Sequence, residues 1–355
     1  MKKPQSRLTA LVFFLLTAAF AAHSQDKGPF NFYINFAGAY QADNGSEDGP
    51  SPWSGSFRAR DLRLEVKGRV NENLYYRFRH NLRSNQATGT LDGFSKGLNM
   101  MFAGYEFNEH FAIEAGKICQ HWGGFDYDEN PLYIYQYSDY IDHIDIFFTG
   151  IDFYWRPDSR HEFVFELSNP ANDLLPVRFP VNALLNWNGN LLDGFVQTRC
   201  AIGGMTQSEG GFGKLLSGGI KFNWPTFQCY FDTMFEKDAV DRIGIATANF
   251  GPAALRPLGE ILYNSNIVKA FWQFSPGWNL VAKGSWDTVR TDAGGKYRDG
   301  LMALCALEYY PEPSQDLRLF AAATLHRVIF NGTGLPDSFT TGRAELGLIY
   351  RIKVF

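Results

Sequence analysis

Apolar and polar residues alternate with a period of two along most of the chain. The pattern is plain over residues 30–41, 62–70, 74–83, 227–236 and 346–354, where an apolar or small residue stands at nearly every second position. Because successive side chains of a β-strand point to opposite faces, this period predicts strands with one apolar and one polar face. A water-soluble β-sandwich alternates in the same way, so the period alone leaves both architectures open.

The connections between these strands separate the two architectures. Short turns are predicted at 71–72, 108–109, 157–160, 188–189, 225–226, 275–277 and 311–315, and long loops near 42–55, 85–97, 119–146, 170–180, 204–213, 238–262, 289–299 and 328–340. Short and long connections follow each other strictly, as in outer-membrane barrels, whereas a sandwich mixes both lengths at both ends. Seven turns and eight loops make fifteen connections and sixteen strands. The strand at 180–187 is inferred from parity alone.

We therefore predict an all-β fold, a transmembrane antiparallel β-barrel of about 16 strands with short periplasmic turns and long extracellular loops. Aromatic residues make up 16% of the chain, and many Tyr and Trp residues stand near predicted strand ends: Tyr105, Trp155, Trp224, Trp272, Trp278, Trp286, Tyr309 and Tyr310. This placement suits aromatic girdles at the two membrane interfaces, although a soluble core would also contain many aromatic residues.

The N-terminus has the pattern of a secretion signal. Lys2, Lys3 and Arg7 precede an apolar stretch over residues 8–22, which ends in small residues up to Ser24. We expect residues 1–24 to be a cleaved signal peptide. Residues 25–355 are then expected to form a single transmembrane β-barrel domain in the outer membrane of a Gram-negative cell.

Charge and cysteine content exclude several classes of protein. The net charge is −4, and without residues 1–24 it is −7, from 30 basic and 37 acidic residues, which argues against a nucleic-acid partner. Beyond residue 22 no apolar run approaches the roughly 18 residues of a membrane-spanning helix. The four Cys residues form no CxxC pair, so neither a metal site, a disulfide framework nor a cofactor is predicted.

Basic residues gather in one stretch of the chain. Residues 58–83 contain eight basic and three acidic residues. Six of the basic side chains share the polar parity and are predicted to form a basic ladder along the lumen: Arg63, Lys67, Arg69, Arg77, Arg79 and Arg83. Guanidinium groups match phosphate and carboxylate oxygens, so the ladder suits an anion path, or else it meets water and acidic neighbours alone. Arg58 and Arg60 share the parity of Leu62 and are expected above the bilayer.

The loop after the fifth strand has the opposite charge. Residues 118–146 contain no Lys or Arg and six acidic residues: Asp126, Asp128, Glu129, Asp139, Asp142 and Asp145. We expect this loop either to fold inward as a constriction facing the basic ladder or to remain a solvated surface loop. The carboxylates at 126–129 leave a Ca²⁺ site open as an alternative.

Motifs of common enzymes are absent from the sequence. There is no GxSxG, HExxH or GxxxxGK[ST] pattern, so no catalytic residue is predicted. A barrel lipase or protease with a Ser–His pair formed in space remains a rival, which covalent labelling with a serine-directed probe would reveal.

Two adjacent segments carry a family resemblance. Residues 38–43 (GAYQAD) and 57–69 (FRARDLRLEVKGR), with 112–117 as a later strand, resemble the phosphate-selective porin O/P family in its form from the Bacteroides group. The resemblance implies a sixteen-stranded, trimeric barrel that conducts small solutes, with phosphate bound by arginines and lysines. Only the arginines and Lys67 of the basic ladder can be carried over, and the acidic loop is a departure from the pattern.

We therefore expect an outer-membrane porin for passive diffusion of small hydrophilic solutes, with a preference for anions or phosphate. The expected partners are those solutes, outer-membrane lipid and further copies of the chain in a homotrimer, with no nucleic acid. The alternative is a closed β-barrel that serves as a structural or adhesion scaffold.

Overall fold

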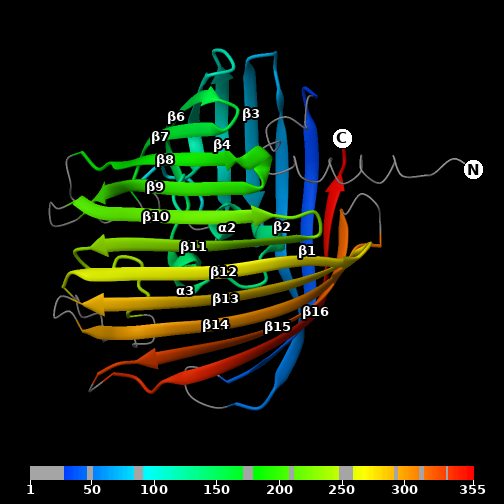
Figure 1. Cartoon of the computed structure of the whole chain (residues 1–355), viewed down its shortest axis with the longest axis vertical. Helices are drawn as coiled ribbons and strands as arrows, with labels where there is room; N and C mark the ends of the chain where they lie inside the picture. Colours follow the sequence, from blue (N-terminus) through cyan, green and yellow to red (C-terminus); the bar gives the residue numbers. More distant parts are fainter. Residues whose placement is uncertain are drawn as a thin grey trace, which may run out of the picture.

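The computed structural model describes residues 28–45, 51–83, 91–170, 179–207, 212–247, 259–291, 295–311, 316–332 and 335–355. The predicted signal peptide lies outside these residues. Sixteen strands form one closed antiparallel barrel (Figure 1). They are β1 (Asn31–Asn44), β2 (Ser54–Arg69), β3 (Leu74–Asn81), β4 (Leu98–Glu106), β5 (Phe111–Cys119), β6 (Phe147–Asp158), β7 (His161–Ser168), β8 (Asn182–Leu191), β9 (Val196–Thr206), β10 (Phe212–Asn223), β11 (Phe227–Asp238), β12 (Ile261–Ser275), β13 (Trp278–Thr291), β14 (Lys296–Tyr309), β15 (Leu317–Phe330) and β16 (Phe339–Lys353).

Each strand pairs with its neighbours in sequence, and β1 closes the barrel against β16. Tyr33 lies opposite Lys353 in this closing pair, so the first and last strands meet with both chain ends on one side. The sixteen-strand prediction is confirmed, and β8 confirms the strand that parity alone had suggested.

The helical elements are short. α2 (Phe125–Asp128), the 3₁₀-helix η2 (Pro131–Tyr133) and α3 (Asp139–His143) all lie in the connection between β5 and β6, and the 3₁₀-helix η3 (Leu192–Gly194) joins β8 to β9. Within the described residues, no helix has both the length and the apolar character needed to span a membrane.

The outward face of the barrel is apolar and open to its surroundings. Leu216 and Val268, on β10 and β12, keep 52% and 54% of their surface exposed, and neighbouring strands expose Phe, Leu and Trp at the same parity. Trp224 and Trp272 belong to the exposed aromatic residues near the turn end. A continuous exposed apolar band of this kind matches the lipid-facing surface of a transmembrane barrel.

One predicted turn was misplaced. Asn188-Gly189 lies inside β8, and the chain reverses four residues later, at η3. Leu192 and Asp193 have positive φ angles of 51° and 55° there, and Gly194 follows with 86°. The Asn-Gly pair resembles a hairpin turn, but the Asp-Gly step takes the left-handed backbone that a tight reversal needs.

The face predicted for Arg58 and Arg60, that of Leu62, was also wrong. The pairing of β1 with β2 slips between Ala37 and Gly38, so Ala37 faces Asp61 and Gly38 faces Ala59. This β-bulge adds one residue to β2 at Arg60 and reverses the parity beyond it. Both arginines therefore belong to the lumen side, where Arg60 pairs with Glu345 at 3.2 Å and Arg58 with Asp43 at 3.7 Å.

Candidate channel interior

The connection between β5 and β6 folds into the barrel and crosses its interior (Figure 1). Its helix α2 packs on β10 and β11, α3 packs on β12, and η2 reaches β1. The backbone N–H of Asp126 donates to Asp232 on β11 at 2.8 Å, and that of Asp139 donates to Asp287 on β13 at 3.2 Å. We call residues 120–146 the inserted loop.

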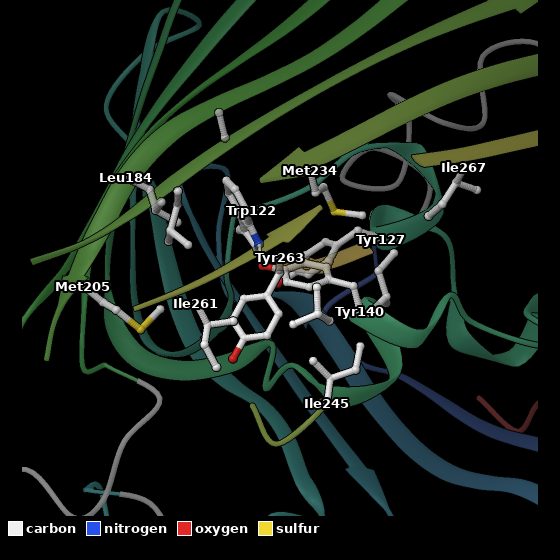
Figure 2. Close-up of a cluster of buried hydrophobic side chains, with 14 of the residues drawn as sticks. Trp122, Tyr127, Tyr140, Leu184, Met205, Met234, Ile245, Ile261, Tyr263 and Ile267 are labelled. Atoms are coloured by element: carbon white, nitrogen blue, oxygen red, sulfur yellow. Dashed lines mark hydrogen bonds between the residues drawn. The ribbon is translucent and has the colours of Figure 1, made fainter. Parts of the chain in front are cut away.

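Apolar packing fixes one side of the inserted loop to the wall (Figure 2). Trp122, Tyr127 and Tyr140 are at most 4% exposed. They lie in a cluster whose wall residues come from β8 to β14 and include Leu184, Met205, Leu215, Met234, Ile261, Tyr263, Ile267 and Val289. The inward face of these strands is therefore not uniformly polar, because the aromatic residues of the loop need apolar partners to bury their surface.

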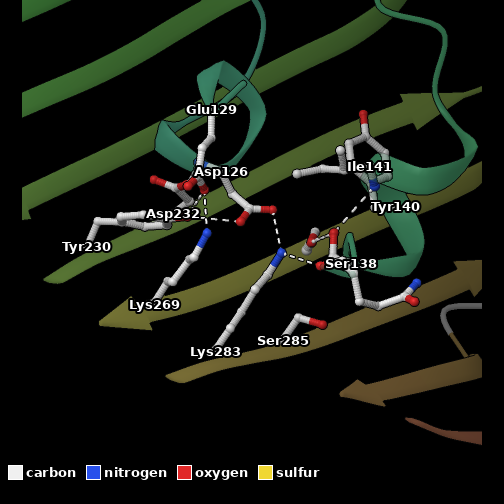
Figure 3. A network of polar contacts seen from close by, with 12 residues as sticks. Asp126, Glu129, Ser138, Tyr140, Ile141, Tyr230, Asp232, Lys269, Lys283 and Ser285 are labelled. Carbon is white, nitrogen blue, oxygen red and sulfur yellow. Dashed lines mark hydrogen bonds and ion pairs between the residues drawn. The ribbon is translucent and has the colours of Figure 1, made fainter. Parts of the chain in front are cut away.

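Ion pairs fix the acidic residues of the loop to the same wall (Figure 3). Asp126 pairs with Lys283 on β13 at 2.7 Å, and both side chains are almost fully buried. Glu129 pairs with Lys269 on β12. Asp128 extends the set by a 2.8 Å pair with Arg199 on β9. These acids face the wall of β9–β13 and are neutralised there, so they do not face the basic ladder as one of our two expectations had it.

Asp139, at the start of α3, is held by an arginine and a histidine of the wall. Its carboxylate lies 2.6 Å from Arg298 on β14 and 2.8 Å from His326 on β15. Burial works against ionisation, but the hydrogen bond from His326 and the charge of Arg298 outweigh it and lower the pKa of Asp139 to about 2. For Asp142 the balance is reversed: burial raises its pKa. Asp145 lies near the root of the loop, beside Phe147.

The inserted loop is also bound to the wall at its start and near its middle. His121 Nε2 lies 3.3 Å from Asp152 on β6, and the His121 backbone N–H donates to Glu166 on β7 at 2.8 Å. Burial alone would lower the pKa of His121, but the charge and hydrogen bond of Asp152 raise it to about 10. On the far side, Arg60 donates to the carbonyl oxygens of Ile134 and Tyr135 at 3.0 and 2.9 Å.

The three carboxylates of the Ca²⁺ alternative each have a basic partner. Asp126, Asp128 and Glu129 form ion pairs with basic residues of three different strands. Their carboxylates are therefore neutralised by Lys and Arg side chains and do not converge on a common cation position. Among the described residues no group of three or more His, Cys, Asp or Glu side chains is arranged to hold a metal ion.

The basic ladder lies on β2 and β3, whereas the α-helices of the inserted loop pack on β10 to β12. Three of its members have acidic partners nearby: Arg63 with Asp61, Arg77 with Glu65, and Arg69 with Glu106. Arg63 and Arg77 make these contacts at 2.7 and 2.6 Å. Lys67 lies 5.5 Å above the ring of Tyr33.

The remaining two members differ sharply. Arg79 is 6% exposed, lies over the ring of Phe147 at 5.3 Å, and its Nε has no hydrogen-bond partner within the described residues. Nη1 of Arg60 and of Arg63 is likewise buried without a partner in that part of the chain. Arg83, by contrast, is exposed and follows the end of β3, so it does not continue the ladder.

Barrel closure extends the ladder to the last strand. Arg351 and Lys353 on β16 lie over the same Tyr33 ring as Lys67, at 4.0 and 5.7 Å. The sequence placed both on the polar parity of the last strand, but only the pairing of β16 with β1 shows that they join the wall of β2. The basic residues that bind the inserted loop were also not identified from the sequence: Arg199, Lys269, Lys283 and Arg298. The signal that could have indicated them is their position on the inward parity of their strands.

Comparison with known proteins agrees with the fold and with the family resemblance. The family model described as phosphate-selective porin O and P matches residues 30–173. A search of curated proteins gives no match.

Solved structures match over nearly the whole length. A trimeric form of OmpT, an outer membrane protein of Vibrio cholerae, is 12% identical, with 92% of this chain and 100% of that chain covered at a TM-score of 0.62. The anion-selective porin from Comamonas acidovorans is 11% identical, with 91% and 99% covered at 0.57. The outer membrane channel DcaP of Acinetobacter baumannii is 9% identical, with 90% and 96% covered at 0.60.

At these identities the likeness concerns the fold. The chain is a closed sixteen-stranded barrel with the architecture of outer-membrane porins, and its residues 30–173 match the phosphate-selective porin O and P family.

Proposed function

We propose that this protein is an outer-membrane porin through which small hydrophilic solutes diffuse passively, with a preference for anions. It acts as a channel rather than an enzyme and needs no cofactor. Residues 1–24 are removed as a signal peptide, the barrel of residues 25–355 assembles as a homotrimer, and the long loops face the outside of the cell. The trimer is supported by a relative with the same fold that forms one.

One observation carries the anion preference. Four acids of the inserted loop, Asp126, Asp128, Glu129 and Asp139, are each neutralised by a cation from β9–β14. Arg60 and Arg63 are also paired, with Glu345 and Asp61, but Arg79 on β3 and Arg351 on β16 each keep a buried Nε without a hydrogen-bond partner among the described residues. The electrostatic balance between the two sides therefore favours anions over cations along β2 and β3.

The position of the loop defines the proposed path. The apolar cluster and the ion pairs occupy the side of the barrel formed by β8–β14, so solutes pass on the side of β2 and β3. A forked guanidinium group there meets a phosphate or carboxylate oxygen with matched donors, and phosphate is the anion that the family match suggests.

The closed scaffold is a second candidate because of the same loop. Apolar packing between the inserted loop and the wall extends to a second cluster, which contains Leu132 and Tyr135 of the loop together with wall residues such as Ala37, Val281 and Phe320. A barrel filled in this way conducts solutes only if the side of β2 and β3 stays open to water.

Liposome swelling separates the two candidates. Proteoliposomes are loaded with an impermeant polymer and diluted into isotonic solutions of sugars and of organic anions. A porin lets these solutes enter and the vesicles swell, faster for anions than for neutral solutes of equal size. A barrel that admits neither class of solute would be a closed scaffold.

A further inference from the structure

A row of basic residues crosses the outer face of the barrel at its loop end. Lys214 on β10 lies opposite Lys237 on β11, Lys237 lies opposite Leu262 on β12, and Leu262 lies opposite Arg290 on β13. Lys296 on β14 continues the row as the partner of Arg290. All four basic side chains are exposed; Lys214, Lys237 and Arg290 share the parity of the apolar outward residues, and Lys296 joins their face across the register shift between β13 and β14. We call them the rim row.

The rim row places like charges next to each other. Directly opposite residues of an antiparallel pair stand about 5 Å apart, and like charges there are destabilising. Lys214 and Lys237 form such a pair. The described acids beside the row are Glu260, which pairs with Lys237 at 2.7 Å, and Asp299, which lies 3.6 Å from Lys296. Four cations against two acids leave a positive edge, which an external anion would stabilise.

Next to the rim row, towards the middle of the barrel, the outer face of β11 and β12 carries a polar patch within an otherwise apolar surface. The hydroxyl of Thr233 donates to Asn266 at 2.9 Å, and the Asn266 amide donates to Asn264 at 2.7 Å, all on the outward parity of β11 and β12. Polar side chains are costly on a surface that faces hydrocarbon. Trp286, 48% exposed, lies opposite Asn266 and carries Lys296 over its ring at 5.4 Å.

We propose that the outer face of β10–β14 binds a phosphorylated glycolipid of the outer leaflet, with phosphates on the rim row and sugar on the polar ledge of Thr233, Asn264, Asn266 and Trp286. The lysines and Arg290 supply the charge, the amides and hydroxyl meet sugar hydroxyls, and the indole offers a flat face for a sugar ring. The acyl chains then run down the apolar strands below, past residues such as Val268 and Phe231.

The other end of the barrel supports this assignment. Around the turns, the outward positions are aromatic: Trp224 packs on Phe227, which lies opposite Trp272, and Phe274 packs on both Trp272 and Trp278. Basic outward residues therefore mark the loop end of β10–β14, and the aromatic residues mark the turn end. Phosphate-bearing glycolipid on the loop side would meet the rim row as soon as the barrel lies in the membrane.

The inference rests on the proposed outer-membrane orientation, and its test leaves the channel itself unchanged. The variant Lys214→Gln, Lys237→Gln, Arg290→Gln and Lys296→Gln is compared with the control Lys96→Gln and Arg160→Gln, which removes exposed charges elsewhere. Each protein is titrated in detergent with bisphosphorylated lipid A, with the same glycolipid lacking phosphates, and with inorganic phosphate, and the retained lipid is measured by native mass spectrometry. Liposome swelling of every variant confirms that the barrel is folded and conducts.

The native protein and the control are expected to retain lipid A, and the rim variant to lose affinity by about tenfold or more, since each basic residue near an anionic surface contributes measurably. Inorganic phosphate should not displace the lipid at equal concentration. Equal retention by the rim variant and the control, or equal binding of the lipid without phosphates, would overturn the proposal. Loss of swelling in the native protein would instead count against the channel function.

Discussion

Arg79 differs from its neighbours on β3 in what its guanidinium group contacts. Glu65 lies directly opposite Arg79 in the strand register but hydrogen-bonds to Arg77. Arg79 is left with the ring of Phe147 and a buried Nε without a partner in the described part of the chain. A charge held this way in the wall acts on ions in the lumen with little compensation.

Replacing Arg79 by Gln should lower the anion-to-cation permeability ratio by about sevenfold, because the Arg79 charge favours the anion and disfavours the cation by the same free energy. A unit charge about 7 Å from the ion path contributes about 0.6 kcal/mol at the dielectric constant of water, close to RT. Arg83→Gln is the matched control, because Arg83 is exposed beyond the end of β3 and should leave the ratio unchanged. Permeability ratios follow from planar-bilayer recordings, and equal effects of the two substitutions would refute the role given to Arg79.

The ion pair of Asp139 sets a lower pH limit for the anchored loop. Its pKa is lowered to about 2 from 3.8, so the ionised form stabilises the folded loop. This contribution is complete above pH 4 and is lost as the pH falls towards 2. Channel current noise should therefore stay constant from pH 7 to 4 and rise below, and the Asp139→Asn variant should be noisy at every pH. Noise that rises already between pH 7 and 5 would contradict this assignment.

At the scale of elements, strands were predictable and the inserted loop was not. Alternation and connection length identified all sixteen strands, because every strand of a barrel has one lipid face and one lumen face. The bulge at Arg60 could not be predicted from the sequence, because the extra residue in β2 is recognised only when its pairing with β1 is known. The basic residues that bind the inserted loop could not be predicted either, because ion pairs such as Asp126–Lys283 join residues more than 150 positions apart in the sequence.

Breaking that ion pair should release the inserted loop. In Lys283→Met the carboxylate of Asp126, which is 0% exposed, loses its main cation, and removing one partner of a buried pair costs about 3–5 kcal/mol. Chymotrypsin should then cleave within residues 120–146 while the barrel stays intact on electrophoresis of unheated samples.

Two further variants make that experiment specific. The double variant with Asp126→Asn should regain most of the protection, because no unpaired charge remains. Lys221→Met removes a lumen lysine that lies 6.0 Å from the ring of Phe125, and it should leave the loop protected. Cleavage at the same rate in all variants would show that the apolar cluster alone holds the loop.

At the scale of the whole molecule, the interior is divided into two unlike sides. The wall of β8–β14 holds the loop through apolar contacts and neutralised acids, and the wall of β2 and β3 presents arginines, joined by Arg351 on β16 across the barrel closure. The net negative charge of the chain does not reveal this division, because many of the acidic side chains are neutralised in internal ion pairs. A net charge therefore predicts little about the field that a solute meets inside.

The reversal potential of the refolded protein in a planar bilayer under a KCl gradient tests the central claim most directly. We predict a reversal potential with the sign of chloride permeation, which becomes smaller when phosphate is added and occupies the arginines of β2 and β3. A potential at zero or with the sign of potassium permeation would contradict the anion path, because the loop acids would then dominate the field despite their ion pairs.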